Sequence, residues 1–364
     1  MKIFYLSNNS FPAKIASSIQ TVKMCEAFSY LKHDVTLVSP NTRKFSENIF
    51  KFYDVKNRFK IKKIKFFKKF PLGFNYYFFS LISIIISLKY KPDIFITRNF
   101  FTSFLLVLFN KKHILELHHD IEIESRIVKF LITKTNYLNS IKLVKLAAIT
   151  NSIKKYFVNN FRLDQKKIIV SPSGSSLSGK FKFNRNKRLK IGYFGSIYKS
   201  RGAETIINLS KVDKKNKYYI YGNLNKYKNL KNISDNLKLN NFVPNKELFR
   251  HVSKMDILLM PYLSRVTATG DVGNIIKYTS PLKLFDYLSS GKVIIASNLP
   301  VLKEVINNNN AIFIKNFDNI RSWKLEIDKI SNNVSRRFII SKNNYKLSKK
   351  FKLISRAKKI LKGI

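Results

Sequence analysis

Residues 278–301 read YTSPLKLFDYLSSGKVIIASNLPV, and this stretch contains a complete helix–turn–strand unit. Apolar residues at helical spacing predict a short helix over 281–289 with one buried face. Ser280 is placed to cap its N-terminus, with Pro281 at the first helical position. Gly291 ends the helix, and 293–295 follow as a short apolar strand.

The same helix carries two residues of opposite charge that suit a nucleotide. A helix N-terminus with a lysine, here Lys283, can hold an anion. Asp286 lies one turn further along, close to the face that carries Lys283, where a carboxylate can bind hydroxyls. The alternative at this point is an ordinary helix and strand of a parallel sheet with no ligand.

The segment SPLKLFDYLSSGKVIIAS resembles the nucleotide-binding segment of GT-B glycosyltransferases, specifically the large family 4, the group 1 glycosyl transferases, in which the pattern is SPxKLFEYMAxGKPVIAS. The resemblance implies that Asp286 holds the donor ribose. A second acid often lies eight positions earlier in the family, where this chain has Tyr278. The donor-binding residues implied by this segment are Tyr278, Ser280, Pro281, Leu282, Lys283 and Asp286.

Length and charge limit the classes of protein that remain. The 364 residues are enough for two domains, and the single cysteine, Cys25, cannot form an internal disulfide, which fits a reducing compartment. The net charge of +48 has three interpretations: compositional drift towards lysine, attraction to anionic lipid, or nucleic-acid binding. We rank them in that order, since the sequence contains no arginine-rich tract or recognised nucleic-acid motif.

The chain opens with a predicted strand at 1–6, a helix at 19–31 and a strand at 34–38. This order indicates a parallel, doubly wound sheet whose ligands lie beyond the carboxyl ends of the strands. The loop after the first strand resembles the family segment that admits the donor diphosphate. By that resemblance its last residues, Ala16, Ser17 and Ser18, bind the donor through small side chains and backbone amides.

Residues Lys56–Lys69 form a basic run without an acid, and aromatic side chains interleave with its later lysines. One interpretation is a solvated edge strand guarded by lysine, and the other is a patch that binds anionic lipid at about 1 kcal/mol per lysine. The apolar run 74–88 is shorter than the ~20 residues that a spanning helix needs, and it predicts a buried helix. No signal peptide is evident at the N-terminus.

A further predicted strand, 114–117, ends in the motif ILELHHD. This motif resembles the family strand that ends in ELH, whose histidine lies over the donor sugar. The position of His118 at the carboxyl end of a strand agrees with a ligand-facing role, whereas His119 points the other way if the strand continues. Either histidine could instead be an ordinary surface residue.

The polar stretch 171–188 interrupts the apolar pattern, which restarts with LKIGYFGSIYKSRGAETI. This segment resembles the opening of the family's second domain, where basic residues bind the donor diphosphate. Arg201, just before a predicted helix N-terminus, and Lys199 are the candidates. Ser196, at a position where the family often has arginine, is a third candidate for contact with the donor.

We therefore predict a GT-B fold, with two Rossmann-like doubly wound parallel-sheet domains that face each other across a cleft. The predicted boundaries are an N-terminal domain at 1–174, a hinge at 175–185, a C-terminal nucleotide-sugar domain at 186–344, and a terminal helix at about 345–364 that packs back on the first domain.

The implied enzyme is a retaining, metal-independent glycosyltransferase without a cofactor. It uses a UDP- or GDP-sugar donor and a cell-envelope or lipid-linked glycan acceptor. The expected location is cytoplasmic, with peripheral attachment to the inner face of the membrane through Lys56–Lys69. Its catalytic residues are His118, Arg201 and Lys283. The alternatives are a nucleotide-sugar epimerase of the same architecture and a non-enzymatic basic protein with a degenerate site.

Overall fold

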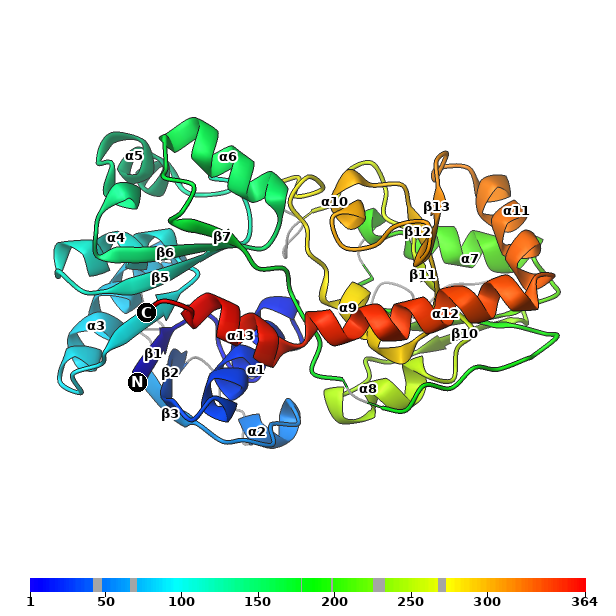
Figure 1. The fold of residues 1–364 in the computed structure, drawn as a ribbon, viewed down its shortest axis with the longest axis horizontal. Coiled ribbons are helices and arrows are strands. Elements are labelled where there is room, and N and C mark those ends of the chain that lie inside the picture. The colour runs from blue at the N-terminus through cyan, green and yellow to red at the C-terminus, as the bar shows by residue number, and fades with distance from the viewer. Residues whose placement is uncertain (42–47, 66–70, 178, 198, 225–232, 268–272) are drawn as a thin grey trace. The chain divides into compact units, whose positions relative to one another are not determined.

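The computed structural model describes residues 1–41, 48–65, 71–177, 179–197, 199–224, 233–267 and 273–364 (Figure 1). The chain forms two compact units, and each is described by itself. The N-terminal unit contains residues 1–173, 278–280 and 353–364, and the C-terminal unit contains residues 174–277 and 281–352.

The N-terminal unit is built on a seven-stranded parallel sheet in the order β3-β2-β1-β4-β5-β6-β7. Its strands are β1 (Lys2–Leu6), β2 (Asp34–Asn41), β3 (Lys60–Lys65), β4 (Ile94–Thr97), β5 (His113–Leu117), β6 (Leu143–Ala148) and β7 (Ile168–Val170). Strand β6 ends at Ala148, and Thr150 then caps the helix that starts at Asn151.

Helices cover both faces of this sheet. They are α1 (Ala16–Tyr30), α2 (Ile49–Phe52), α3 (Leu72–Leu88), α4 (Phe100–Leu108), α5 (Arg126–Lys134), η1 (Tyr137–Asn139), α6 (Asn151–Phe161) and α13 (Leu353–Leu361). Side chains alternate along β1, so Ile3 and Tyr5 pack towards α1 and α13, whereas Phe4 and Leu6 pack towards α3 and α4. Helices α3 to α6 therefore form one layer, and α1 with α13 lies on the opposite face.

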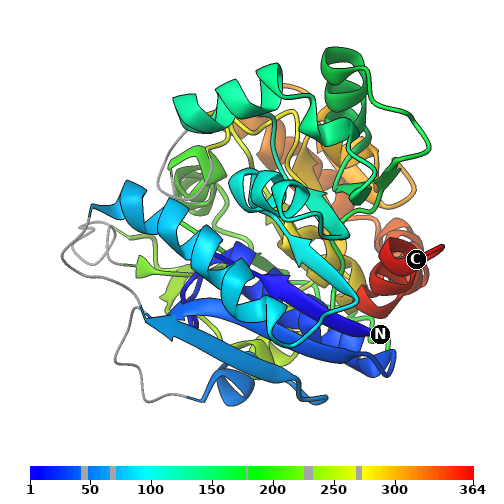
Figure 2. The same ribbon diagram turned by 90° about the vertical axis from the view of Figure 1, so that its left-hand side faces the viewer.

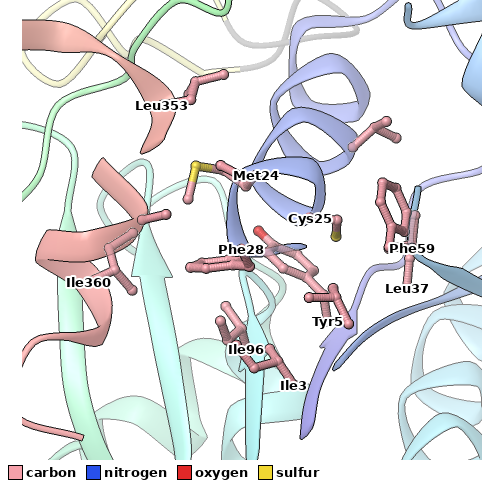
Figure 3. Packing of buried hydrophobic residues seen from close by; sticks show 14 of the residues in the cluster. Ile3, Tyr5, Met24, Cys25, Phe28, Leu37, Phe59, Ile96, Leu353 and Ile360 are labelled. Carbon is pink, nitrogen blue, oxygen red and sulfur yellow. The ribbon is translucent and has the colours of Figure 1, made fainter. Parts of the chain in front are cut away.

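The C-terminal helix α13 completes the core of the N-terminal unit. Its Leu353 and Ile360 lie near Met24 and Phe28 of α1, as Figure 3 shows. The predicted terminal helix at 345–364 is two helices, since α12 (Val334–Ser348) ends first, and η4 (Lys349–Phe351) lies between it and α13. The part that belongs to the N-terminal unit starts at residue 353.

The C-terminal unit has a six-stranded parallel sheet in the order β10-β9-β8-β11-β12-β13. Its strands are β8 (Lys190–Phe194), β9 (Lys217–Tyr221), β10 (Leu237–Asn240), β11 (Ile257–Met260), β12 (Val293–Ser297) and β13 (Ala311–Ile314). Its helices are η2 (Lys199–Arg201), α7 (Ala203–Val212), α8 (Asn245–Val252), α9 (Leu282–Ser290), α10 (Pro300–Lys303), α11 (Ile320–Ser331) and α12.

The segment 175–185 leads into this second sheet and packs against α12. The hydroxyl of Tyr345 donates to the carbonyl of Gly179 at 3.1 Å, and the ring of Phe181 lies 5.5 Å from the ring of Tyr345. The predicted fold class is confirmed: both halves of the chain are parallel α/β units of the doubly wound type.

Candidate donor-binding site

Helix α9 starts at Leu282, one residue later than predicted, and Gly291 ends it in the left-handed conformation at φ 63°. The predicted N-terminal cap is wrong. Ser280 makes no capping bond in α9, because its hydroxyl oxygen accepts the backbone N–H of Ser173 at 3.1 Å. The predicted buried face is correct at Phe285 and Leu288, while Leu282 stays half-exposed.

The ammonium of Lys283 lies inside the C-terminal unit. Its Nζ is buried, has no hydrogen-bond partner among the residues that the structure describes, and lies 3.8 Å from the ring centroid of Tyr193 and 5.5 Å from that of Tyr262. A side chain on Gly195, the first residue after β8, would place its Cβ 2.9 Å from this Nζ, so the glycine leaves room for the lysine. Burial, with the nearby charge of Arg201, holds the pKa of Lys283 well below its ordinary value.

Arg201 is the second cation of this group and is held in place by the chain after β11. Its Nη2 donates to the carbonyl of Thr267 at 2.8 Å, and its guanidinium lies 5.4 Å from the ring centroid of Tyr262. Gly202 follows at φ 73° as the N-cap of α7, and a Cβ there would lie 1.7 Å from the carbonyl oxygen of Pro261. Only glycine fits this approach, and it places Arg201 beside a helix N-terminus.

The other two candidates of this segment lie on the same turn. Ser196 is exposed after β8, and its carbonyl oxygen accepts the hydroxyl of Tyr193 at 2.6 Å. Lys199 opens η2, two residues before Arg201. The carboxyl end of β8 and the N-terminus of α9 therefore bring two predicted phosphate contacts, Arg201 and Lys283, into one group.

Asp286 has a partner that the sequence reasoning missed. The hydroxyl of Ser175 donates to Oδ1 of Asp286 at 2.6 Å, and Ser175 also receives the backbone N–H of Leu177 at 2.9 Å. The sequence pattern marks Ser175 only as part of the polar stretch 171–188 that interrupts the apolar pattern. This contact fixes the orientation of the carboxylate on α9, so Ser175 is a positioning residue for Asp286.

Tyr278 groups with the N-terminal unit instead of with α9. Its ring packs against Tyr156 with centroids 6.0 Å apart. Burial raises the pKa of Tyr278 to about 12, with a further contribution from the carboxylate of Asp120, to which its hydroxyl is hydrogen-bonded. The Tyr278 phenol is therefore neutral at neutral pH, and its hydroxyl is hydrogen-bonded to Asp120, an acid of the same unit.

A buried charged cluster lies at the carboxyl end of β5 in the N-terminal unit. Glu116 accepts a hydrogen bond from the hydroxyl of Tyr5 at 2.6 Å and forms an ion pair with Nη1 of Arg356 at 2.5 Å. Burial raises the pKa of Glu116, but Arg356, His118 and Arg98 together outweigh this effect and hold the pKa well below its ordinary value. Arg356 also donates to the carbonyl of Ser171, so it ties α13 to the end of β7. The sequence analysis missed Arg356, although an acid inside an apolar strand signals a buried partner.

His118 lies next to this cluster. Its Nε2 is buried, has no hydrogen-bond partner within the described ranges, and lies 3.7 Å from Oε2 of Glu116. Burial and the nearby Arg98 lower the pKa of His118 to about 3, so the imidazole is neutral at physiological pH and can exchange hydrogen bonds without carrying charge. His119 turns away to contact Glu124 at 3.6 Å.

The loop after β1, which is predicted to bind the donor diphosphate, ends before residue 16. Helix α1 starts at Ala16, so Ala16, Ser17 and Ser18 form its first turn. The backbone N–H of Ser18 donates to the carbonyl of Ile15, and the carbonyl of Ser17 accepts Nη1 of Arg98 at 3.3 Å. The Ser18 amide is therefore hydrogen-bonded within the first turn of α1, and the contacts of Ala16, Ser17 and Ser18 with the donor stay a prediction.

Comparison with known families and structures relates one part of the chain to a family and the whole chain to a fold. Residues 188–333, which include Arg201, Lys283 and Asp286, match the family model described as Glycosyl transferases group 1. No curated protein sequence matches this one.

Solved structures extend the similarity over the whole chain. A glycosyltransferase from Rickettsia africae is similar at 17% identity over 100% of both chains, with a TM-score of 0.70. Anabaena Alr3699/HepE in complex with UDP-glucose is similar at 12% identity over 99% of this chain and 98% of that one, with a TM-score of 0.67. WaaG, a glycosyltransferase involved in lipopolysaccharide biosynthesis, is similar at 11% identity over 99% and 100%, with a TM-score of 0.63.

The low identities mean that these structures show the fold, which is GT-B. The family match adds the enzyme class, and the expectation of a glycosyltransferase is confirmed at that level. The comparisons do not assign any side chain of this protein a role.

Proposed function

We propose that this chain transfers a sugar from a UDP- or GDP-sugar to a cell-envelope or lipid-linked glycan, with retention of configuration and without a metal ion. The observation that carries the proposal is the buried ammonium of Lys283, which has no hydrogen-bond partner in the described part of the chain and lies near a second cation, Arg201. A buried cation without a counter-ion is destabilising unless a ligand supplies one. A diphosphate at the N-terminus of α9 supplies that counter-charge.

The same contacts would assist the reaction. When the bond between sugar and diphosphate breaks, negative charge grows on the leaving phosphate. Lys283, Arg201 and the first N–H groups of α9 would stabilise this charge, and they are fixed before the reaction starts. Asp286, oriented by Ser175, would accept hydrogen bonds from the donor ribose.

The acceptor is the least constrained part of the proposal. One similar structure, WaaG, is named for lipopolysaccharide biosynthesis, which supports a cell-envelope glycan. With a lipid-linked acceptor, the enzyme would have to act at the inner face of the membrane, where the run Lys56–Lys69 would meet anionic lipid. Of this run the structure describes residues 56–65.

The proposal is tested by measuring the thermal shift with UDP, GDP, ADP and CDP and comparing each with the shift that its nucleoside causes. We expect one nucleoside diphosphate to stabilise the protein by about 2.7 kcal/mol at 100 times its dissociation constant. If none of the four raises the unfolding temperature, the donor site is absent and a non-enzymatic protein is the better description. Turnover of a nucleotide-sugar without any acceptor would favour the epimerase.

The role of His118 is tested by the His118→Ala variant. We expect transfer to fall by about 100-fold or more, within the range typical of catalytic side chains, while the dissociation constant of UDP or GDP stays within about twofold. The reason is that His118 is neutral and is proposed to contact the sugar instead of the nucleotide. Initial-rate kinetics and calorimetry provide the two readouts. His33→Ala, in the same unit beside the N-terminus, is the control, and equal rates in the parent and the His118 variant would refute the assignment.

A further inference from the structure

Helix α3 has an unusual distribution of polarity. Its 17 residues, LGFNYYFFSLISIIISL, contain no charged side chain. The polar residues point inwards: Ser80, Ser83 and Ser87 are fully buried, and each donates its hydroxyl to a backbone carbonyl of α3 itself. The helix therefore satisfies its polar groups internally and does not present them to water.

The outward face of the same helix is apolar. Phe74, Phe78, Leu81 and Ile85 follow the spacing that places side chains along one stripe. Phe74 is 47% exposed, Leu81 36% and Ile85 40%, and the rings of Phe74 and Phe78 stack at 5.9 Å. The sequence analysis expected a buried helix here, and that expectation is wrong for this stripe.

The neighbouring helices continue the apolar surface. Helix α4 packs beside α3 and α5 beside α4, in the layer that faces the viewer in Figure 2. Helix α4 also has no charged residue, and Leu108 at its end is 64% exposed. On α5, Ile127 and Phe130 are 55% and 60% exposed. We call the exposed side chains of Phe74, Leu81, Ile85, Leu108, Ile127 and Phe130 the apolar helix face.

Compositional drift does not explain this face. Lysine and arginine account for 69 of the 364 residues, and drift would place lysines on exposed helix positions here as elsewhere. Instead, α3 and α4 carry no lysine, and lysines gather beyond the C-terminal ends of these two helices. Lys89 and Lys91 follow α3, and Lys111 and Lys112 follow α4. Helices α3 and α4 lead into β4 and β5, which are neighbouring strands of one parallel sheet. These four lysines therefore lie together at the amino-terminal ends of those strands.

The edge strand β3 adds to this basic rim. The Nζ of Lys62 lies 4.1 Å from the ring centroid of Tyr90, two residues beyond the end of α3. Lys63 and Lys65 are exposed on the same strand. An apolar face with a basic rim matches an anionic bilayer surface, in which apolar side chains enter the acyl region and lysines meet headgroups. A second copy of the chain would instead bring the basic rims close to each other.

We propose that the apolar helix face inserts into the interface of an anionic membrane, with α3 lying in the membrane plane. No helix in the described part of the chain is long and apolar enough to cross a membrane, so the attachment is peripheral. This inference goes beyond electrostatic attraction of the basic run, and it does not depend on the donor site.

The test compares sedimentation with vesicles of phosphatidylcholine alone and with added phosphatidylglycerol. We expect the parent to bind the anionic vesicles and to keep part of that binding at about 1 M salt, where the screening length is about 3 Å. The double variant Leu81→Gln, Ile85→Gln should partition at least about tenfold more weakly, since two large side chains no longer gain from burial. Both positions are exposed, so circular dichroism should show a normally folded protein.

The matched control is the double variant Leu325→Gln, Ile339→Gln, which replaces two exposed apolar residues of the C-terminal unit. This control should bind vesicles as the parent does. The triple variant Lys62→Gln, Lys63→Gln, Lys65→Gln should lose only the salt-sensitive part of the binding. Equal binding by the parent and the Leu81, Ile85 variant would overturn the proposal.

An introduced tryptophan reports the depth of insertion directly. Ile85→Trp should shift its emission to the blue on anionic vesicles and should be quenched by brominated lipid. The native Trp323 is fully buried in the C-terminal unit and gives a constant background. Unshifted emission would also overturn the proposal. So would a dimer in sedimentation velocity that the Leu81, Ile85 variant dissociates, because the face would then bind a second copy.

Discussion

The Lys283→Ala variant should lose about 2–5 kcal/mol of affinity for a nucleoside diphosphate and almost none for the matching nucleoside, because truncating one partner of a buried charge pair costs this much. Turnover should fall further than affinity, since the charge on the leaving phosphate grows in the transition state. Calorimetric titration with both ligands, together with initial rates, measures the three effects.

Two comparisons make this result specific. Asp286→Asn should weaken nucleoside and diphosphate alike, by about 1–3 kcal/mol, because it would bind the ribose. Lys292→Ala removes another buried lysine of the same unit, one whose Nζ donates to the carbonyl of Lys182 at 3.0 Å. That control should lower stability and leave nucleotide affinity unchanged. If Lys283→Ala loses as much affinity for nucleoside as for diphosphate, α9 does not hold phosphate.

The ligand-free behaviour of the same variant provides an independent check. In the parent the Lys283 ammonium is buried with no hydrogen-bond partner in the part of the chain that the structure describes, and such burial is destabilising. The variant should therefore unfold at a temperature no lower than the parent. Binding should also depend on pH: the pKa of Lys283 is lowered in the free protein and rises when a phosphate pairs with it. Diphosphate affinity should fall as pH rises above the free-protein pKa, and the variant should lack this dependence.

The second large effect concerns the buried ion pair between α13 and β5. The Arg356→Met variant should lose about 3–5 kcal/mol of unfolding free energy, because it leaves the buried carboxylate of Glu116 without its cation. Urea unfolding followed by circular dichroism measures the change. The exposed Arg126→Met, on α5, should change stability by less than about 0.5 kcal/mol.

A double variant separates charge from packing. Glu116→Gln combined with Arg356→Met removes both charges and should cost less than the sum of the two single changes. Since the pKa of Glu116 is lowered in the folded protein, its contribution to stability is present above the ordinary value of 4.5 and is lost as pH falls below it. Glu116→Gln should lack this acid-sensitive part, and additive single effects would show that the pair is not coupled.

The parallel α/β architecture was predictable from the sequence because it depends on local pattern. Apolar strands alternate with amphipathic helices in both halves, and this alternation specifies parallel sheets. Helix α9 is almost entirely determined in this way, by its apolar spacing and by Gly291. Its basic residue Lys283 and its acid Asp286 could be assigned to one helix face from spacing alone.

The predictions that failed depend on groups far apart in the chain. Ser280 did not cap α9 because Ser173, 107 positions away, uses its hydroxyl oxygen. Ser175 was overlooked because its contact with Asp286 spans 111 positions. The first turn of α1 was read as a loop, since residues 16–18 carry no strong helix signal of their own.

By itself the sequence determined the two sheets, helix α9 and the basic character of the chain, because each of these depends on neighbours within a few residues. Only the tertiary structure decided that Lys283 lies buried near Arg201 with no hydrogen-bond partner among the described residues, that Glu116 meets Arg356 across 240 positions, and that α3 hides its serines and exposes the apolar stripe at Phe74, Leu81 and Ile85. Burial and pairing of this kind depend on which segments the fold brings together, and local periodicity does not contain that information.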